Sequence, residues 1–396
     1  MAAQLALSIL LSVAASAANP ANGVSRLLHV GPGFEFARIE DAVSAAKSGD
    51  MVVVHSLPGG DAYEQTAVLV RKPGITIIGD PDGGGRVRIS GKGFNYSGEG
   101  SVPRAVFQFD PEADGCTLSG FEIFDARNES HNGAGVRINQ ADNVTVRNCE
   151  IHRCDMGVMS NGAPSTRAAK NQLFEKCNIH HNGSADEPGF SHNMYLGGWN
   201  ATVKLCEVHH STCGHNIKSR TGIILIEDSY IHDSANRELD IVDADETNAW
   251  KSDAYINRCL IIKAKNCKGN RAVIHYGQDM GGVRNGTMYI DETTIVTPFN
   301  SPVVQMSSPN VHAALSKTTV WDGGAGRNNM TLISVSNGAS LDHTLGYKLS
   351  LAHGFEKGLP AHIAYTSPGQ RTRYIDPGER LELENPISGE IVFTGY

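Results

Sequence analysis

The feature that most constrains the fold of this chain is a short motif that recurs along it. The segment Cys149-Glu150-Ile151-His152 returns as Cys177-Asn178-Ile179-His180 and as Cys206-Glu207-Val208-His209. With degenerate copies included, the third position of the motif falls in steps of 23 to 34 residues at Ile123, Ile151, Ile179, Val208, Ile231, Ile261 and Ile295. A repeat of this length is typical of solenoids, in which each unit packs against its neighbours.

Short runs of alternating apolar residues fill each repeat, as in Val144-Thr145-Val146 and Ile223-Ile224-Leu225-Ile226. Asn, Gly and Asp separate these runs, so the pattern predicts an all-β solenoid with three short strands per coil. At the N-terminal end, Ile39–Lys47 has the spacing of a short amphipathic helix, which we expect to cap the open end of the solenoid. The repeat fades from about Gly338, where we expect a C-terminal cap or irregular strands.

Composition excludes several classes of protein. Hydrophobic residues make up 40% of the 396 residues and the net charge is only −8, so a disordered chain is excluded. The 34 basic residues are outnumbered by 42 acidic ones, and we expect no nucleic-acid partner. The apolar run Leu5–Val13 and the small residues Ala15-Ser16-Ala17 predict a signal peptide over residues 1–17. We therefore expect a secreted or periplasmic monomer that begins near Ala18 and has no membrane span.

The eight cysteines fit the repeat better than a disulfide framework. Most of them directly precede an apolar-x-apolar pattern, which predicts small core residues stacked from coil to coil. Disulfides between Cys149 and Cys154 or between Cys206 and Cys213 stay open as alternatives. No pair has Cys-x-x-Cys spacing, and His180-His181 and His209-His210 belong to the repeated turn, so the sequence does not favour a zinc site.

The chain resembles right-handed parallel β-helix proteins of the pectate-lyase-like superfamily. The resemblance is carried by the opening FARIEDAVSAAKSGDMVVV, the strand KPGITIIG and coils of the type VTVRNCEIHRC. It implies a single-stranded right-handed parallel β-helix in one domain, residues 18–396, with an N-terminal cap over 27–80, coils over 81–335 and a C-terminal cap over 338–396. Members of this superfamily are mostly secreted enzymes that act on acidic polysaccharides, and lyases, hydrolases, esterases and epimerases share the scaffold.

One element narrows the resemblance further. Asn216-x-Lys218-Ser219 looks like the Lys-Ser element of family-six polysaccharide lyases, the alginate lyase and chondroitinase B type. Those enzymes also carry Arg-His-Gly one coil later, where this chain has Glu238-Leu239-Asp240. The resemblance therefore implies a divergent lyase more than a direct member of that family.

Polar residues concentrate on three consecutive predicted strands, His192–Leu196, His215–Arg220 and Arg237–Asp243. Because side chains alternate along a strand, Met194, Leu196, Ile217, Leu239 and Ile241 should point inward. The residues expected to point outward are Asn193, Tyr195, Asn216, Lys218, Arg220, Glu238 and Asp240. In register, Tyr195, Lys218 and Asp240 should form a ladder across three coils. The loops 182–191 and 243–253 are the expected walls of a groove.

This mixture of residues suits β-elimination on a uronic acid, which needs a neutralised carboxylate, a base and an acid. Lys218 is the predicted base and Tyr195 the predicted acid, or the two share both roles, and Arg220 with Asn216 would hold the carboxylate. We expect His192 and His215 to assist catalysis. Predicted contacts to an acidic polysaccharide complete the site, namely Asn193, Asn216, Arg237, His275, Tyr276, Trp199 and Arg137.

The acidic residues of these strands have two interpretations. Glu238, Asp240 and Asp243 would bind Ca²⁺, or they would form ion pairs with Lys218, Arg220 and Arg237. The preferred function is a secreted polysaccharide lyase. The alternatives are a glycoside hydrolase that uses Glu238 and Asp240 or Asp243 as its carboxylate pair, and a non-catalytic glycan-binding or adhesin β-helix.

Overall fold

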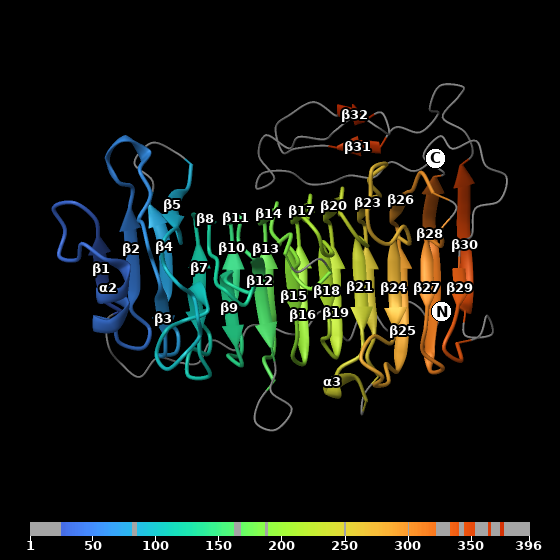
Figure 1. Cartoon of the computed structure of the whole chain (residues 1–396), viewed down its shortest axis with the longest axis horizontal. Helices are drawn as coiled ribbons and strands as arrows, with labels where there is room; N and C mark the ends of the chain where they lie inside the picture. The colour runs from blue at the N-terminus through green and yellow to red at the C-terminus, as the bar shows by residue number, and fades with distance from the viewer. Residues whose placement is uncertain are drawn as a thin grey trace.

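The computed structural model describes residues 25–80, 85–161, 168–186, 189–248, 251–299, 301–321 and 333–339, and the strand segments 344–352, 363–365 and 373–375. In these residues the chain winds into stacked coils whose strands run parallel from coil to coil (Figure 1). The predicted signal peptide 1–17, the predicted start at Ala18 and much of the predicted C-terminal cap lie outside the described residues.

One side of the solenoid is a parallel sheet with one strand from each of ten coils. In spatial order along the solenoid, its strands are β3 (Val68–Val70), β6 (Ala105–Phe109), β9 (Ala134–Asn139), β12 (Met156–Asn161), β15 (Met194–Leu196), β18 (Ile217–Ser219), β21 (Leu239–Val242), β24 (Ile274–Gly277), β27 (Val304–Met306) and β29 (Ile333–Val335). This ten-stranded sheet carries the polar residues that the sequence singled out.

The remaining coil strands form two further parallel rows. The first row contains β1 (Leu27–Val30), β2 (Met51–His55), β4 (Thr76–Asp80), β7 (Thr117–Ser119), β10 (Thr145–Arg147), β13 (Gln172–Glu175), β16 (Asn200–Lys204), β19 (Ile223–Glu227), β22 (Ala254–Asn257), β25 (Gly286–Asp291), β28 (Val311–Trp321) and β30 (Thr344–Ala352). The second row contains β5 (Val87–Ser90), β8 (Phe121–Phe124), β11 (Glu150–His152), β14 (Asn178–His180), β17 (Glu207–His209), β20 (Tyr230–His232), β23 (Leu260–Ile262) and β26 (Thr294–Val296). The long strand β28 pairs with both β25 and β26 and so belongs to both rows.

The register confirms the repeat read from the sequence. Ile151 pairs with Ile123 on one side and with Ile179 on the other, and Ile179 pairs in turn with Val208. The series continues through Ile231, Ile261 and Ile295. Equivalent residues therefore lie directly above one another, and three strands per coil with parallel stacking make this the predicted right-handed parallel β-helix.

A one-residue bend joins the two rows in each coil and explains the cysteines. Asn148, Lys176 and Leu205 take the left-handed conformation, with φ of 51°, 54° and 53°, and the small side chain that follows each of them is buried. The N–H of Cys206 donates to Ser229 Oγ at 3.1 Å, in the equivalent place one coil later. All eight cysteines are free, so the core interpretation holds and the two alternative disulfides do not form.

The N-terminal end is closed by the helix α2 (Ile39–Ala45), which contacts β1, β2 and β3 (Figure 1). Its residues Ile39, Ala42 and Val43 are buried in the hydrophobic core, as expected of a cap. The other short helical segments are a 3₁₀ turn at Pro58–Gly60 and α3 (Asp245–Asn248).

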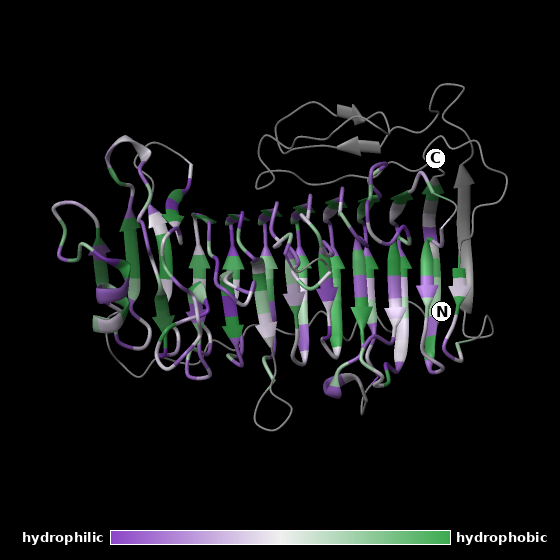
Figure 2. Ribbon diagram, in the orientation of Figure 1, coloured by the Kyte–Doolittle hydropathy of each residue, from purple (hydrophilic) through white to green (hydrophobic). Residues whose placement is uncertain are grey.

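Beyond the predicted coils, β30 pairs with β28 and extends the parallel stack to Ala352, while β31 (Ile363–Tyr365) and β32 (Arg373–Ile375) pair antiparallel. Hydrophobic residues alternate with hydrophilic ones along the strands (Figure 2), and the apolar side chains of all three rows fill one continuous core. Among the described residues, no helix has the length and apolar character to cross a membrane.

Candidate active site

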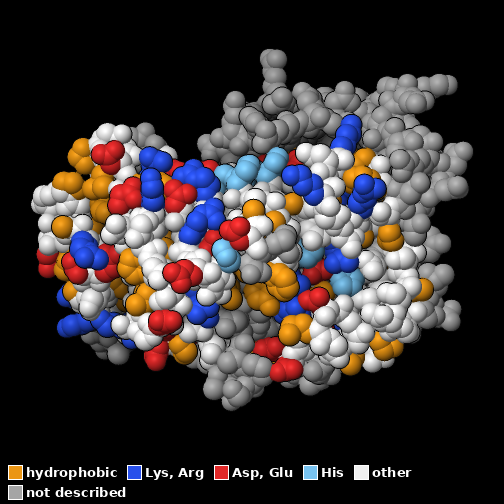
Figure 3. Space-filling view, viewed as in Figure 1, with side chains coloured by type: hydrophobic (Ala, Val, Ile, Leu, Met, Phe, Trp, Pro, Cys, Tyr) orange, Lys and Arg blue, Asp and Glu red, His pale blue; other side chains and the backbone are white. Residues whose placement is uncertain are grey.

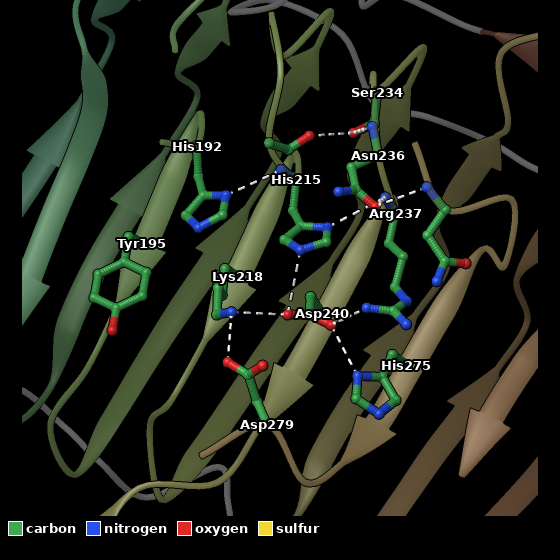
Figure 4. A network of polar contacts seen from close by, with 12 residues as sticks. His192, Tyr195, His215, Lys218, Ser234, Asn236, Arg237, Asp240, His275 and Asp279 are labelled. Atoms are coloured by element: carbon green, nitrogen blue, oxygen red, sulfur yellow. Dashed lines mark hydrogen bonds and ion pairs between the residues drawn. The ribbon is translucent and has the colours of Figure 1, made fainter. Parts of the chain in front are cut away.

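The predicted ladder of polar side chains is present on the ten-stranded sheet. Tyr195 on β15 pairs with Lys218 on β18, and Lys218 pairs with Asp240 on β21. The row continues to His275 on β24 (Figure 4) and from there to Gln305 on β27. In the other direction Met159 lies between Tyr195 and Arg137, so that Arg137 stands two coils from Tyr195 on the same row. The predicted inward residues Met194, Leu196, Ile217, Leu239 and Ile241 are all fully buried.

A carboxylate that the sequence analysis missed covers this row. Asp279 lies in the loop between β24 and β25, and its Oδ2 accepts a hydrogen bond from Lys218 Nζ at 2.8 Å. The same oxygen accepts a hydrogen bond from Arg220 Nη2. Partial burial opposes ionisation of Asp279, but Lys218 and Arg220 outweigh it and lower the pKa of this carboxyl. Asp279 is thus an ionised group held between two cations.

Arg220 connects Tyr195 to this ion-pair cluster. Its Nε donates to the phenol oxygen of Tyr195 at 2.9 Å, and its Nη1 donates to the backbone oxygen of Asp243 at 2.5 Å. Burial would lower the pKa of Arg220, but Tyr195 and Asp279 raise it instead. A guanidinium fixed in this way stabilises negative charge on the phenol oxygen.

Asp240 is the buried anion of the row. Its Oδ2 lies 3.2 Å from Lys218 Nζ and 3.4 Å from His215 Nε2, and its Oδ1 accepts hydrogen bonds from Arg237 Nη1 at 3.0 Å and His275 Nδ1 at 2.8 Å (Figure 4). Burial alone would raise the pKa of Asp240. The neighbours His215, His275 and Lys218 outweigh that effect and hold this pKa well below its ordinary value.

The two histidines that begin the site strands are stacked and neutral. The N–H of His215 donates to His192 Nδ1 at 3.0 Å, and the N–H of Arg237 donates to His215 Nδ1 at 3.2 Å. Each ring therefore carries its hydrogen on Nε2, and the two ring centroids lie 5.1 Å apart. Burial lowers the pKa of His215 to about 4 and that of His192 well below its ordinary range. Because the Nδ1 atoms already accept these backbone hydrogen bonds, they cannot accept a proton from a substrate.

Downstream partners complete the row. Ser307, which the sequence analysis did not single out, donates its hydroxyl to His275 Nε2 at 2.6 Å and accepts a hydrogen bond from the N–H of Gln278 at 2.9 Å. Arg237 Nη2 donates to Gln305 Oε1 at 3.1 Å. His275 and Arg237 are thereby positioned beside Asp240, and the row is tied to the loop that carries Asp279.

Three residues predicted to face outward lie inside the coil instead. Asn193, Asn216 and Glu238 are fully buried, so Asn193 and Asn216 do not reach a substrate. Asn193 Nδ2 donates to Asn216 Oδ1 at 2.8 Å and to the backbone oxygen of His209, and Asn216 Nδ2 donates to Glu238 Oε2 at 2.6 Å. The prediction was wrong because these residues stand in the bend before each strand, where the alternation of an extended strand does not apply.

Tyr276 is a second correction. It pairs in register with Ile241, faces the core and is fully buried, with its hydroxyl donating to the backbone oxygen of Ser252 at 2.7 Å. Burial raises its pKa to about 12. Trp199 is half-buried in the turn between β15 and β16.

The three acidic residues proposed for Ca²⁺ do not share a site. Glu238 faces the interior beside Ser234, where burial raises its pKa to about 7. Asp240 is surrounded by Lys218, Arg237 and two histidines. Asp243 accepts hydrogen bonds from the N–H groups of the Asp279 loop. This donor set does not fit a calcium ion, and the ion-pair interpretation describes Asp240 better. The buried Glu238 also cannot serve as one of two carboxylates for a hydrolase.

A loop that the sequence analysis did not single out packs beside the row. Residues 278–285 pack against β18 and β21, since Asp243 Oδ2 accepts a hydrogen bond from the N–H of Gly282 at 2.6 Å and Arg284 Nη1 donates to the backbone oxygen of Val242 at 2.9 Å. On the far side, the predicted wall 182–191 contributes Ser184, whose hydroxyl bonds to His131 Nδ1 at 2.9 Å. Histidine, basic and acidic side chains gather on the face shown in Figure 3.

Comparisons with known proteins agree with this fold. A family model described as a right handed beta helix region matches residues 109–194. An alginate lyase from Paenibacillus sp. str. FPU-7 has a similar structure, with a TM-score of 0.54 and 14% identity over 81% of this chain and 99% of that enzyme. Rice weevil pectin methyl esterase has a TM-score of 0.45 and 12% identity over 85% of this chain and 92% of the esterase, and the pectate lyase Pel9A has 0.44 and 11% over 83% and 80%. A search of curated protein sequences finds no match.

The chain is therefore a right-handed parallel β-helix. At 14% identity the likeness to the alginate lyase shows the fold alone. Any activity has to be argued from the residues of the row.

Proposed function

We propose that this protein is an exported polysaccharide lyase that cleaves a uronate-containing glycan by β-elimination. The observation that carries the proposal is the cluster of Lys218 and Arg220 around one carboxylate oxygen, with the hydroxyl of Tyr195 bonded to the same guanidinium. Elimination requires that the uronate carboxylate be neutralised beside a group that moves a proton. The similar fold of an alginate lyase and the signal peptide predicted at residues 1–17 support the same conclusion.

The carboxylate of Asp279 marks the place for the carboxylate of the sugar. Lys218 and Arg220 converge on Asp279 Oδ2, whereas their own positions are set by β18 and by hydrogen bonds to other groups. The side chain of Asp279 is 38% exposed and belongs to a loop, so it is the member of the cluster that a substrate can displace. An incoming uronate that replaces Asp279 would have its charge neutralised by both cations, which makes its C5 proton more acidic.

Tyr195 is the group that we assign to proton transfer. Its phenolate oxygen takes the C5 proton, the C4–C5 double bond forms as the C4–O bond breaks, and the same proton passes to the leaving glycosidic oxygen. Arg220 Nε, 2.9 Å from this oxygen, stabilises the phenolate. The sequence placed Lys218 in the role of base. Two carboxylates lie within 3.2 Å of its Nζ, so we assign it to charge neutralisation.

The buried carboxylate of Asp240 supports this arrangement. It holds Lys218 from below at 3.2 Å and is itself fixed by His215, Arg237 and His275. When a substrate displaces Asp279, Lys218 keeps this second anion and therefore its position. Arg137, on the same row two coils away, is placed to contact a neighbouring sugar.

The first experiment is a screen of the purified protein against alginate, pectate, glucuronan and glycosaminoglycans, with absorbance at about 235 nm as the signature of the unsaturated product of proton abstraction. A rise on one substrate supports the lyase and identifies the glycan. Reducing ends released without this absorbance would show hydrolysis instead. Binding without any product would leave the protein as a glycan-binding module.

Two substitutions separate the roles on the active substrate. Tyr195→Phe should lower kcat by about 10²–10⁴-fold, the usual contribution of a proton-transfer group, while Tyr255→Phe on the first row of strands should leave it unchanged. Lys218→Arg keeps the positive charge but cannot act as a base, so we expect it to retain activity to within about tenfold. A loss as large as that of Tyr195→Phe would return the role of base to Lys218.

A further inference from the structure

A second cluster of ionisable residues lies on the second row of strands, away from the candidate active site. Equivalent positions of successive coils stack His152, His180, His209 and His232, with ring centroids 5.0, 4.8 and 4.8 Å apart. Histidine side chains form a row near the upper edge of the face in Figure 3. At the end of this stack the pattern changes, because an acidic residue, Asp233, stands where the two preceding coils have a second histidine.

Hydrogen bonding orients the ring of His232. Its Nε2 lies 3.0 Å from Glu207 Oε1, so Nε2 carries a hydrogen that it donates to this buried carboxylate. Its Nδ1 lies 2.8 Å from Asp233 Oδ2. A ring nitrogen and a carboxylate oxygen attract each other at that separation only with a cation between them, either a proton or a metal ion.

A chain of hydrogen bonds sets the tautomer of His210 in the same way. His209 Nε2 donates to Asn178 Oδ1 at 3.0 Å, which leaves His209 Nδ1 as an acceptor. His210 Nδ1 lies 2.6 Å from that atom and therefore donates to it. The nitrogen of His210 without a hydrogen is thus Nε2, and it lies 3.7 Å from Asp233 Oδ2.

We propose that His210, His232 and Asp233 bind a divalent transition-metal ion of the zinc class. Their ligand atoms lie within 4.8 Å of one another, and two imidazole nitrogens with one carboxylate oxygen are a preferred ligand set for zinc. Glu207 plays the supporting part that such sites require, since a carboxylate bonded to the far nitrogen of a ligating histidine fixes its orientation. The alternative set Glu207, His209 and His232 lacks this support, because it uses that carboxylate as a ligand.

The site borders a cavity of about 540 Å³ that is lined by His210, Asp233, Tyr230, His181, Lys265 and Lys268 among others. Three protein ligands leave a tetrahedral ion one further position, and zinc sites of that kind take water or an anion there. Three lysines line the cavity, namely Lys263, Lys265 and Lys268, and they suit an anionic fourth ligand. The site is separate from the row of Tyr195 and Lys218, so this proposal stands or falls independently of the lyase activity.

The test uses the full chain, purified without a histidine tag and dialysed against EDTA, with Zn²⁺ and Co²⁺ as the probes. We expect calorimetric binding of one Zn²⁺ with Kd below about 100 µM, and visible absorption of four-coordinate Co²⁺ at the same stoichiometry. His210→Gln and Asp233→Asn should each weaken binding by about 100-fold. His152→Gln makes the same kind of substitution in the stack of His152, His180, His209 and His232. It should alter Kd by less than about threefold, because His152 lies two coils before His209 and bonds to Glu122.

Two results would overturn the proposal. One is the absence of Zn²⁺ binding to the unsubstituted protein in that concentration range. The other is a Kd for Zn²⁺ that is the same in His210→Gln and Asp233→Asn as in His152→Gln, since the ion would then lie elsewhere. Circular dichroism and the thermal midpoint of each variant show whether the coil around β17 and β20 is intact.

Discussion

Replacement of Asp279 by asparagine tests how the candidate active site admits a substrate. In the structure Asp279 Oδ2 accepts hydrogen bonds from Lys218 Nζ at 2.8 Å and from Arg220 Nη2, and a uronate carboxylate has to take over both. Asparagine has nearly the same shape but no charge, so it competes far less for the two cations. We expect the substitution to improve substrate binding and to leave the chemical step intact.

The size of the effect follows from the exposure of the carboxylate. An exposed ion pair contributes about 0.2–1 kcal/mol and a buried hydrogen bond to a charged group about 1.5–3 kcal/mol. Asp279 lies between these cases, with a side chain that is 38% exposed. A net competition of about 1–2 kcal/mol corresponds to a KM that falls by about 5- to 30-fold, with kcat within about threefold.

The assay is steady-state formation of the unsaturated product by Asp279→Asn, with Asp245→Asn as the matched control. Asp245 is an exposed residue of α3, and its substitution removes the same charge from the neighbourhood without touching Lys218 or Arg220. We expect its KM to change by less than about twofold. A kcat that drops more than about tenfold in Asp279→Asn at unchanged KM would refute the reasoning, because Asp279 would then act in the reaction itself.

Three further predictions follow from the buried groups. Asn216→Ala removes four hydrogen bonds of a fully buried side chain and should lower the free energy of unfolding by about 3–5 kcal/mol. The control Asn171→Ala, at an exposed residue, should lower it by less than about 1 kcal/mol. Equal denaturation midpoints of the two variants would contradict this prediction. The pKa of His215 is about 4 in the folded protein against an ordinary value of 6.5, so the unfolded chain binds a proton at a higher pH than the folded protein does. The free energy of unfolding therefore falls as the pH drops below 6.5, by about 2 kcal/mol at pH 5. His215→Gln should remove that part of the loss in chemical unfolding at pH 7 and pH 5. EDTA should leave the lyase rate unchanged, since Asp240 faces cations; abolished activity that Ca²⁺ restores would overturn our account of this residue.

The register of the coils was predictable from the sequence for a physical reason. In a parallel solenoid each coil hydrogen-bonds to the next in register, so residues at equivalent places in the repeat must lie above one another. Ile151 over Ile179 follows from the motif alone, and the same argument places Tyr195, Lys218 and Asp240 in one row. The cysteines were predictable too, since the bend at each repeat admits only a small side chain.

The strand ends were less predictable. Alternation assigned Asn193, Asn216 and Glu238 to the outer face, whereas the bend before each strand turns their side chains into the coil. There they bond to backbone groups that the turn would otherwise leave unsatisfied, such as the backbone oxygens of His209 and His232. The two His-Asn pairs that begin these strands are a signal for such a bend, because a polar residue recurs where the repeat changes direction.

The features that repeat could be predicted from the amino-acid sequence: the coil length, the inward face of each strand and the row of Tyr195, Lys218 and Asp240. The positions of the non-repeating segments depend on contacts that form only in the folded chain. Asp279 reaches Lys218 because three N–H groups of its loop bond to Asp243, 36 or more residues earlier, and no local pattern encodes such a contact. His210 likewise approaches Asp233 only through a contact between neighbouring coils. Because the hydrogen bonding between coils is periodic, the scaffold can be predicted from the sequence repeat. The candidate active site, in contrast, depends on long-range contacts that each occur once.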